Sequence, residues 1–370
     1  MTNDLEKLMD RRKTIILLGS GGVGKTSCSL GVAILAARKG KKVGLLSIDP
    51  AKRLASAMGI SLGSNLKTID FGSHLEMKGS LDAAMLDQKA VFDDMVKKHA
   101  PSPETAQKIL EHPLYIAAST KLAGPSEYMA LAKLQEMIES KEFDLIVLDT
   151  PPDTHALDFL SRPNILSGFM ENKVMNWLIK PFHVARKMGV NKLLTVGERL
   201  MGGLTRVTGI QALSVMTEFL VLMQQVIEGF HKSGEKLLET LHSKETGFVL
   251  VTSCHNAALR SAKNLAEQLV AYGYALDGVI FNKCMPLNLT GKSSSYLEED
   301  QTGVNEQPNF HCLIETLHQV YKREKDAAQY YVGLLNKQYD LSPFAIKVPE
   351  RLHSLHSLEE IYRFSFAFNH

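Results

Sequence analysis

A glycine-rich segment that ends in a lysine and a threonine carries the clearest chemical signal in the sequence. Residues 19–26 fit the pattern G-x-x-x-x-G-K-[ST], which forms a phosphate-binding loop. Glycines lack a Cβ, so the backbone can turn tightly and direct successive N–H groups at phosphate oxygens. The Lys25 ammonium group can then reach the β- and γ-phosphates, and the Thr26 hydroxyl can ligate Mg²⁺. The residues predicted to contact ATP or ADP here are Gly21, Gly22, Val23, Gly24, Lys25, Thr26 and Ser27.

Two aspartates stand at the ends of apolar runs downstream of this loop. Asp49 follows residues 42–48. In nucleotide hydrolysis it can orient or deprotonate the attacking water, or it can hold Mg²⁺ through water. The alternative role for Asp49 is to cap the helix that follows it. Asp149 follows residues 143–148, and an aliphatic strand that ends in aspartate is typical of a Walker B segment. The predicted catalytic residues are Lys25 and Asp49, and the predicted Mg²⁺ ligands, partly through water, are Thr26, Asp49 and Asp149.

Strand-like and helix-like segments alternate around these residues and explain why they should meet. A strand at 15–18 precedes the loop and a helix at 27–39 follows it. Further strands are expected at residues 42–48, 143–148, 246–253, 276–283 and 344–348. Because ligands of open α/β sheets bind at the carboxyl ends of the strands, the loop and both aspartates should face one crevice. We predict the α/β class, with a P-loop NTPase fold that resembles the SIMIBI type: a mostly parallel sheet flanked by helices, with an inserted α-helical subdomain.

The inserted subdomain is predicted from helical periodicity and from a shift in composition. Apolar residues at helical spacing run from Leu81 to Met137, interrupted by a loop at 112–128 that contains Gly124 and Pro125. The segment from Asp158 to about Glu245 is also mostly helical by pattern and is rich in methionine. Its methionines predict either an adaptable groove for an apolar client or ordinary helical core. We assign residues 1–74, 138–160 and 246–370 to the nucleotide-binding core, and residues 75–137 and 161–245 to the helical subdomain.

The composition is that of a globular protein and offers no general attraction for nucleic acid. The 42 Lys and Arg residues nearly balance the 40 Asp and Glu residues, and 45 % of the chain is hydrophobic. The first residues resemble no signal peptide, and polar residues interrupt the longest apolar stretch, at 212–230. The four cysteines form no CxxC pair and no disulfide framework, so we expect a reducing, cytoplasmic location.

Polar residues near the last strands are open to two interpretations. Asn282 stands at the end of the strand 276–283, where its amide can pair with an adenine edge or simply occupy a turn. His353 and His356 have no carboxylate or cysteine companions at ligand spacing. We interpret these two histidines as surface or packing residues.

Several segments together resemble the arsenite-pump ATPase family, which includes the eukaryotic targeting ATPase for tail-anchored membrane proteins. They are GSGGVGKTS, IDPAKRLASAMG, DTPPDTHALDFL, the IFNK strand end and the closing VPE, and the likeness extends from Lys13 to about Phe366. Two further segments, MLDQKAVFDDMV and AGPSEYMALAKL, are similar to the bacterial branch of this family. The resemblance implies a dimer that closes over two nucleotides, with helical lobes that rearrange on hydrolysis. It also implies that Asp49 belongs to switch I, that Asp149 starts switch II, and that the adenine pocket includes Asn282, Pro349 and Glu350.

The chain departs from this family pattern at three points. The family carries a second lysine directly after the first loop glycine, which reaches the opposite protomer's nucleotide, and this chain has Ser20 there. A homodimer should therefore hydrolyse ATP slowly unless Lys52, Arg53 or a paralogous partner supplies the missing charge. The chain also lacks the CxxC motif that holds zinc in the tail-anchor factor, and it lacks clustered thiolates, so no zinc site and no arsenite site are expected. With a single P-loop, the site needs a second protomer.

These observations favour a dimeric, Mg²⁺-dependent ATPase whose nucleotide state rearranges a helical lobe, as a homodimer or as a heterodimer with a paralogue. The alternative is an ATP-clamped scaffold or regulatory subunit with little hydrolysis. A positioning ATPase of the MinD/ParA type is disfavoured, because the sequence has neither a basic DNA-binding stripe nor a strongly amphipathic C-terminal helix. We accordingly expect no nucleic-acid partner and only an indirect link to membranes.

Overall fold

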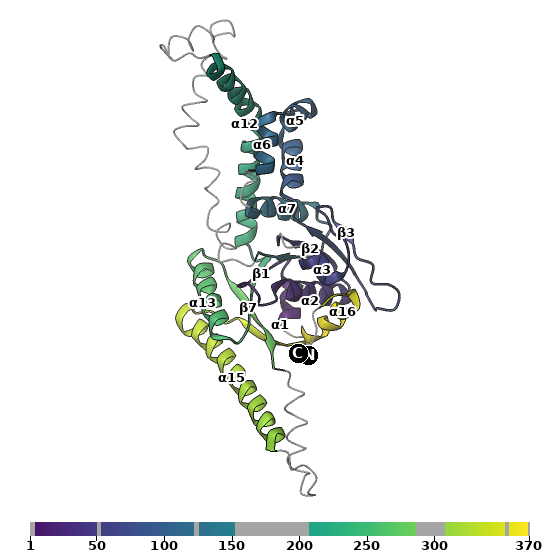
Figure 1. Ribbon diagram of the computed structural model, residues 1–370, viewed down its shortest axis with the longest axis vertical. Coiled ribbons are helices and arrows are strands. Elements are labelled where there is room, and N and C mark those ends of the chain that lie inside the picture. Colours follow the sequence, from purple (N-terminus) through teal and green to yellow (C-terminus); the bar gives the residue numbers. More distant parts are fainter. Residues whose placement is uncertain are drawn as a thin grey trace. The chain divides into compact units, whose positions relative to one another are not determined.

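The structure is a computed structural model that describes residues 4–49, 53–121, 126–151, 207–285, 308–351 and 355–368 (Figure 1). Contacts divide the chain into two compact units. Among the described residues, the first unit takes those within Met1–Leu86, Glu136–Ser161 and Thr240–His370, and the second takes those within Asp87–Gln135 and Arg162–Glu239.

A mostly parallel sheet forms the centre of the first unit. Its strand order is β3-β4-β2-β5-β1-β6-β7-β8, and every neighbouring pair is parallel except β3 with β4. The strands are β1 Thr14–Leu18, β2 Lys42–Ser47, β3 Lys67–Thr68, β4 Ser80–Met85, β5 Leu145–Asp149, β6 Thr246–Thr252, β7 Leu276–Cys284 and β8 Phe344–Pro349. This arrangement confirms the predicted α/β fold class.

The apolar runs of the sequence become the central strands because both faces of the sheet are covered. All residues of β1, β5 and β6 are buried, as expected for parallel strands between helical layers. The register pairs Asp149 with Leu17 on one side and with Ser47 on the other. The carboxyl ends of β1, β2 and β5 therefore lie level at one edge of the sheet.

Helices surround this sheet, and α2 (Lys25–Arg38) is the most buried of those in the described chain. It contacts β2 and β5 on one side and α16 and the 3₁₀ helix η3 on another. A Cβ built on Gly31 would lie 2.3 Å from the Phe368 ring, so only glycine allows this close packing. The other helices with residues in the first unit include α1 Asp4–Arg11, α3 Arg53–Met58, α13 Asn256–Ala271, α15 Pro308–Tyr339, α16 Leu358–Phe364 and η3 Ser365–Phe368.

The second unit is helical. It contains α4 Gln88–His99, α5 Pro103–Leu110 and α6 Pro113–Lys121, with most of α7 Ser126–Ser140 and α12 Val207–His242. Its core consists of Val96, Ala106, Ile109, Tyr115, Met223 and Val226. Among the methionines of the predicted client segment, Met223 is thus ordinary core, whereas Met170, Met175, Met188 and Met201 lie outside the described residues.

Two secondary-structure predictions are wrong in this part of the chain. The helix expected from Leu81 is preceded by a strand, because β4 pairs in parallel with β2 and its apolar residues suit both periodicities. The helix begins only at α4, where the Asp87 side chain caps it by accepting from the Ala90 amide. The loop expected at 112–128 contains α6, which starts with a proline at a favourable position and buries Tyr115.

Two of the described helices, α12 and α15, are long enough to raise the question of whether they could cross a membrane. None of the helices that the structure describes combines the length and the apolarity needed to cross a bilayer. The apolar stretch at 212–230 lies within α12.

Candidate functional site

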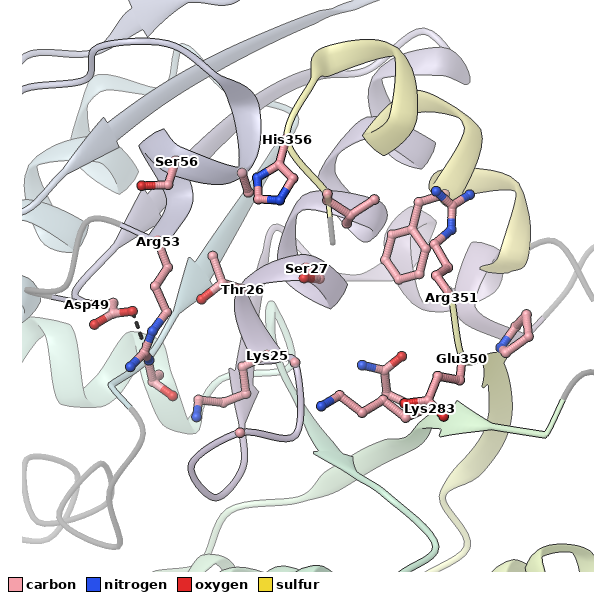
Figure 2. A pocket seen from close by; sticks show the side chains of 18 residues that line it. Lys25, Thr26, Ser27, Asp49, Arg53, Ser56, Lys283, Glu350, Arg351 and His356 are labelled. Carbon is pink, nitrogen blue, oxygen red and sulfur yellow. Dashed lines mark ion pairs between the residues drawn. The ribbon is translucent and has the colours of Figure 1, made fainter. Parts of the chain in front are cut away.

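The carboxyl ends of five strands, β1, β2, β5, β7 and β8, border one cavity of about 710 Å³ in the first unit. Figure 2 shows that the side chains around it come from the loop after β1, from the segment after β2, and from the ends of β7 and β8. The predicted site residues in its wall are Gly22, Gly24, Lys25, Thr26, Ser27, Asp49, Asn282, Pro349 and Glu350. The rest of the wall consists of Arg53, Ser56, Ala57, Thr150, Lys283, Arg351, Leu355, His356 and Phe364.

Three predicted site residues lie beside or below this cavity and do not form its wall. Gly21 is an exposed residue of the loop, and Val23 is buried with 4 % of its surface accessible. Asp149 is completely buried beneath the loop. The loop therefore presents only some of its residues to the cavity and buries Val23.

The loop conformation depends on glycine. Gly22 and Gly24 have φ values of 79° and 86°, which L-residues with side chains rarely adopt. A Cβ on Gly24 would lie 2.2 Å from the Asn282 amide nitrogen. Gly24 directly precedes α2, so the first turn of this helix borders the cavity, as in an anion site at a helix N-terminus.

Two side chains hold the loop from within. Lys25 is 6 % exposed, and its Nζ donates to the carbonyl oxygens of Gly19 at 2.8 Å and Ser20 at 3.2 Å. The Asn282 Nδ2 donates to the Val23 carbonyl at 2.8 Å. The sequence indicated Asn282 as an adenine or turn residue, but it did not predict this contact with the loop.

The buried Asp149 carboxylate is surrounded by hydroxyl groups. Ser29 Oγ donates to its Oδ1 at 3.2 Å and Ser47 Oγ donates to its Oδ2 at 2.9 Å. Burial raises the pKa of Asp149, while hydrogen bonds from Thr26 and Ser47 oppose that shift. The Ser47 hydroxyl also accepts from the Asp49 backbone amide at 3.3 Å, so it connects the two aspartates. The signal for Ser47 was its place at the end of the second strand, next to the predicted Asp149 strand.

Asp49 faces the cavity and pairs with an arginine of α3. Arg53 Nη1 lies 3.2 Å from Asp49 Oδ2, and the side chains are 57 % and 3 % exposed respectively. The dashed line in Figure 2 marks this ion pair. Lys52, the neighbouring candidate cation, and the residues that would decide the capping role of Asp49 lie outside the described chain.

The opposite side of the cavity contains aromatic and apolar residues that the sequence did not indicate. The Arg351 guanidinium lies 5.2 Å from the centre of the Phe364 ring, and Leu355 is nearby in the wall. His356, interpreted from the sequence as a surface or packing residue, also lines the cavity, and its backbone amide donates to Glu360 at 2.8 Å. Their position could have been inferred from the segment after the last strand, which starts at the same edge of the sheet.

Comparison with known proteins decides the family. The model of a family described as "Anion-transporting ATPase" matches residues 12–307, which include the loop, both aspartates and Asn282. The chain belongs to the anion-transporting ATPase family. This confirms the family and the ATPase class that the motifs predicted. Pro349 and Glu350 lie beyond the matched residues of this family.

Individual relatives support the same assignment. The chain is 26 % identical over 283 residues to "ATPase GET3" of Malassezia globosa, covering 76 % of each chain. It is 25 % identical over 293 residues to "ATPase ASNA1 homolog" of Entamoeba dispar, covering 77 % of this chain and 81 % of that one. It is 24 % identical over 340 residues to "ATPase ASNA1 homolog 2" of Paramecium tetraurelia, covering 88 % and 94 %.

The donor atoms at this cavity suit a magnesium ion, the usual metal of phosphate chemistry. Mg²⁺ prefers oxygen ligands and binds through a few side chains plus phosphates and water. Thr26 offers a hydroxyl in the cavity wall, Asp49 a carboxylate beside it, and Asp149 a carboxylate within hydrogen-bond reach of Thr26. The predicted set therefore fits the ion, with Asp149 acting from below the wall.

Proposed function

We propose that this member of the anion-transporting ATPase family binds MgATP in the cavity and hydrolyses it as a dimer, with the helical unit rearranging between nucleotide states. The observation that carries this proposal is the meeting of Lys25, Asp49 and Asn282 with the end of β8 around one cavity. These residues come from distant parts of the sequence. Their meeting at the carboxyl edge of a parallel sheet matches the place where such folds bind ligands.

In this mechanism the loop binds the phosphates and Lys25 moves. In the structure its Nζ donates to the Gly19 and Ser20 carbonyls. On nucleotide binding the ammonium group would exchange these partners for β- and γ-phosphate oxygens, while the loop amides bind the remaining charge. Asn282 keeps the loop in shape through its bond to Val23, which leaves its amide oxygen for the base.

Asp49 is the proposed catalytic residue for water. Its carboxylate lies at the cavity wall, where it can orient the attacking water and accept its proton. Mg²⁺ would be held by Thr26, Asp49 and Asp149, and it would neutralise charge on the phosphates when bound. Asp149 keeps the Thr26 hydroxyl oriented from below, and Ser29 and Ser47 fix the Asp149 carboxylate in turn.

Ser20 determines how fast this reaction can be. In related phosphoryl transfers, a cation supplied by a partner increases the rate by a factor of roughly 10³ to 10⁵. Since serine carries no charge, we propose slow turnover alone and faster turnover when Arg53, Lys52 or a lysine-bearing paralogue supplies it. Arg53 is the described candidate, because its exposed side chain lines the cavity.

The serine at position 20 also favours a second candidate function. If nothing replaces the missing lysine, the protein would be an ATP-clamped scaffold or regulatory subunit that holds nucleotide and hydrolyses little. The pairing of Arg53 with Asp49 is consistent with this state, because the arginine is then engaged within its own chain.

Binding of an apolar protein client by the helical unit, and a cytoplasmic location, stay predictions from the sequence and its resemblance.

A substitution at Ser20 separates the two functions. Single-turnover hydrolysis of MgATP is measured for the wild-type protein, for Ser20→Lys, and for Ser20→Gln, which has a long side chain without charge. For a homodimeric ATPase we expect Ser20→Lys to hydrolyse about tenfold faster or more, and Ser20→Gln to match the wild type. Rates should also rise more steeply than linearly with protein concentration until the dimer saturates.

The outcome that contradicts the ATPase proposal is equally clear. If wild type and Ser20→Lys both retain bound ATP without releasing phosphate, alone and with a lysine-bearing paralogue, the clamped scaffold is correct. If Lys25→Ala binds nucleotide as well as the wild type does, both candidates fail. Lys263→Ala is the matched control, since Lys263 lies in α13 outside the cavity wall.

A further inference from the structure

Two cysteines lie side by side at the sheet edge, outside the wall of the nucleotide cavity. Cys254 follows β6 and Cys284 ends β7, and their Sγ atoms are 3.8 Å apart. Thirty positions separate them in the sequence, so only the pairing of β6 with β7 brings them together. Cys28, by contrast, is completely buried in α2. The described chain thus holds one pair of neighbouring thiols, which the sequence spacing did not reveal.

The surrounding backbone permits a bond between these sulfur atoms. Neighbouring strands lie about 4.8 Å apart, and a disulfide needs Cα atoms roughly 4.4 to 6.8 Å apart. Thr252 pairs with Phe281, and Cys254 and Cys284 follow two and three residues beyond this last pair. The sulfur atoms must approach to about 2.05 Å, which requires side-chain rotation and a small shift of both backbone segments that carry the cysteines.

The two thiols have different surroundings and so different roles. Cys254 is partly exposed, and a hydrogen bond with the Cys284 thiol lowers its pKa, helped by Lys347 and opposed by burial and by Glu324. Cys284 is 3 % exposed and its thiol donates to the Phe281 carbonyl at 3.1 Å. The contact with Cys254, and then burial, raise the pKa of Cys284. Cys254 is therefore the thiol that ionises and meets an oxidant first.

We propose that Cys254 and Cys284 form a reversible disulfide, with a peroxide as oxidant. The Cys254 thiolate attacks one peroxide oxygen, the O–O bond breaks, and the released hydroxide takes a proton to become water. Cys284 then attacks the sulfenic sulfur of Cys254, the S–S bond forms, and a second water leaves. Two thiols lose two electrons and two protons in total, and one hydrogen peroxide becomes two waters. A thiol reductant reverses the reaction by exchange.

The disulfide would act on the proposed nucleotide site, and this step rests on that proposed function. Asn282 and Lys283 directly precede Cys284 and both line the cavity. The Cys284 carbonyl also accepts from the Glu350 amide at 2.7 Å, so the same backbone holds the end of β8. Lys283 has φ 59°, a backbone conformation that residues other than glycine rarely adopt. Its backbone therefore has few other conformations available when Cys284 moves. Pulling Cys284 toward Cys254 therefore displaces cavity residues from their reduced positions.

The expected result is a coupling between redox state and nucleotide affinity. We expect the oxidised protein to bind nucleotide about fivefold to tenfold more weakly, within the range of typical coupling between sites. Linkage requires the reciprocal effect, so saturating nucleotide should protect the dithiol by the same factor. For this two-electron couple, a tenfold factor corresponds to about 30 mV in midpoint potential.

The test begins with the bond itself. The full-length protein is treated with hydrogen peroxide under native conditions, free thiols are alkylated, and the peptides are analysed by mass spectrometry. We expect a Cys254–Cys284 linked peptide that disappears after dithiothreitol, and no linked peptide in the double variant C254S/C284S, which keeps Cys28 and Cys312. The inference is overturned if Cys254 proceeds to sulfinic acid without a link, or if the link forms only in urea.

The second measurement concerns nucleotide binding. Affinity for a fluorescent ADP analogue is compared between reduced and oxidised wild type, with C254S/C284S treated identically as the control. Equal affinities of the two wild-type forms would overturn the coupling. If the reduced protein binds no nucleotide while the linked peptide is found, the proposed function fails and the disulfide stands. If no linked peptide is found, the inference fails whatever the nucleotide result.

Discussion

Replacing Asp49 by asparagine should abolish hydrolysis while sparing the fold and nucleotide binding. Asparagine has nearly the same shape, and the change removes the charge that pairs with the 57 % exposed Arg53 side chain. An ion pair with one exposed partner contributes about 0 to 1 kcal/mol, so the free energy of unfolding should fall by less than about 1 kcal/mol. A general base contributes roughly 10² to 10⁴ in rate. At 1.36 kcal/mol per factor of ten, the barrier should rise by about 3 to 5 kcal/mol.

The assay is single-turnover release of labelled γ-phosphate with protein in excess over MgATP, alongside binding of a fluorescent nucleotide and urea unfolding. Glu359→Gln is the matched control. Glu359 pairs with Arg363 at the same i,i+4 spacing, but it lies in α16 outside the cavity wall. We expect this control to hydrolyse ATP as the wild type does. If Asp49→Asn released phosphate at the wild-type rate, the assignment of Asp49 as the residue that activates water would be refuted.

Four further substitutions test other parts of the account. Asn282→Asp should weaken nucleotide binding by about tenfold or more in a fluorescence titration, because it replaces the donor at the Val23 carbonyl with a charged acceptor. Asp149→Asn should lose Mg²⁺-dependent nucleotide binding without losing stability. Burial raises the pKa of Asp149, so the free energy of unfolding falls as pH rises from the ordinary carboxyl pKa toward the raised one. Urea unfolding of the variant should lack this pH-dependent fall. Gly31→Ala should lower the free energy of unfolding by about 1 to 3 kcal/mol because its Cβ would lie 2.3 Å from the Phe368 ring, whereas Gly234→Ala, with open space around it in α12, should raise it by roughly 0.5 to 1 kcal/mol.

The sheet and the loop were predictable because their signals are local. The apolar run before Gly19 marks a strand buried on both faces, and the lysine and threonine after the glycines mark the start of a helix. Aspartates that follow such runs must lie at the carboxyl edge, wherever the strands stand in the sheet. The sequence thus predicted which strand ends meet before the strand order was known.

The rest depended on contacts between residues far apart in the sequence. Residues 80–85 show apolar spacing that suits a helix as well as a strand, and only pairing with β2 decides for the strand. Nothing in the sequence singles out Ser29 and Ser47, but in the structure both hydroxyls donate hydrogen bonds to the Asp149 carboxylate. The pairing of Cys254 with Cys284 likewise follows from strand order, which single-sequence patterns do not encode.

The central claim is that one triphosphate and its magnesium ion bind where the carboxyl ends of these strands meet. A crystal structure with a non-hydrolysable ATP analogue and Mg²⁺ tests it most directly. The account predicts phosphates on the amides of residues 22–27, the Lys25 ammonium group turned from its loop carbonyls to the phosphates, and the base beside Asn282 and Glu350. Nucleotide density elsewhere on the protein, with Lys25 still donating to Gly19 and Ser20, would contradict it.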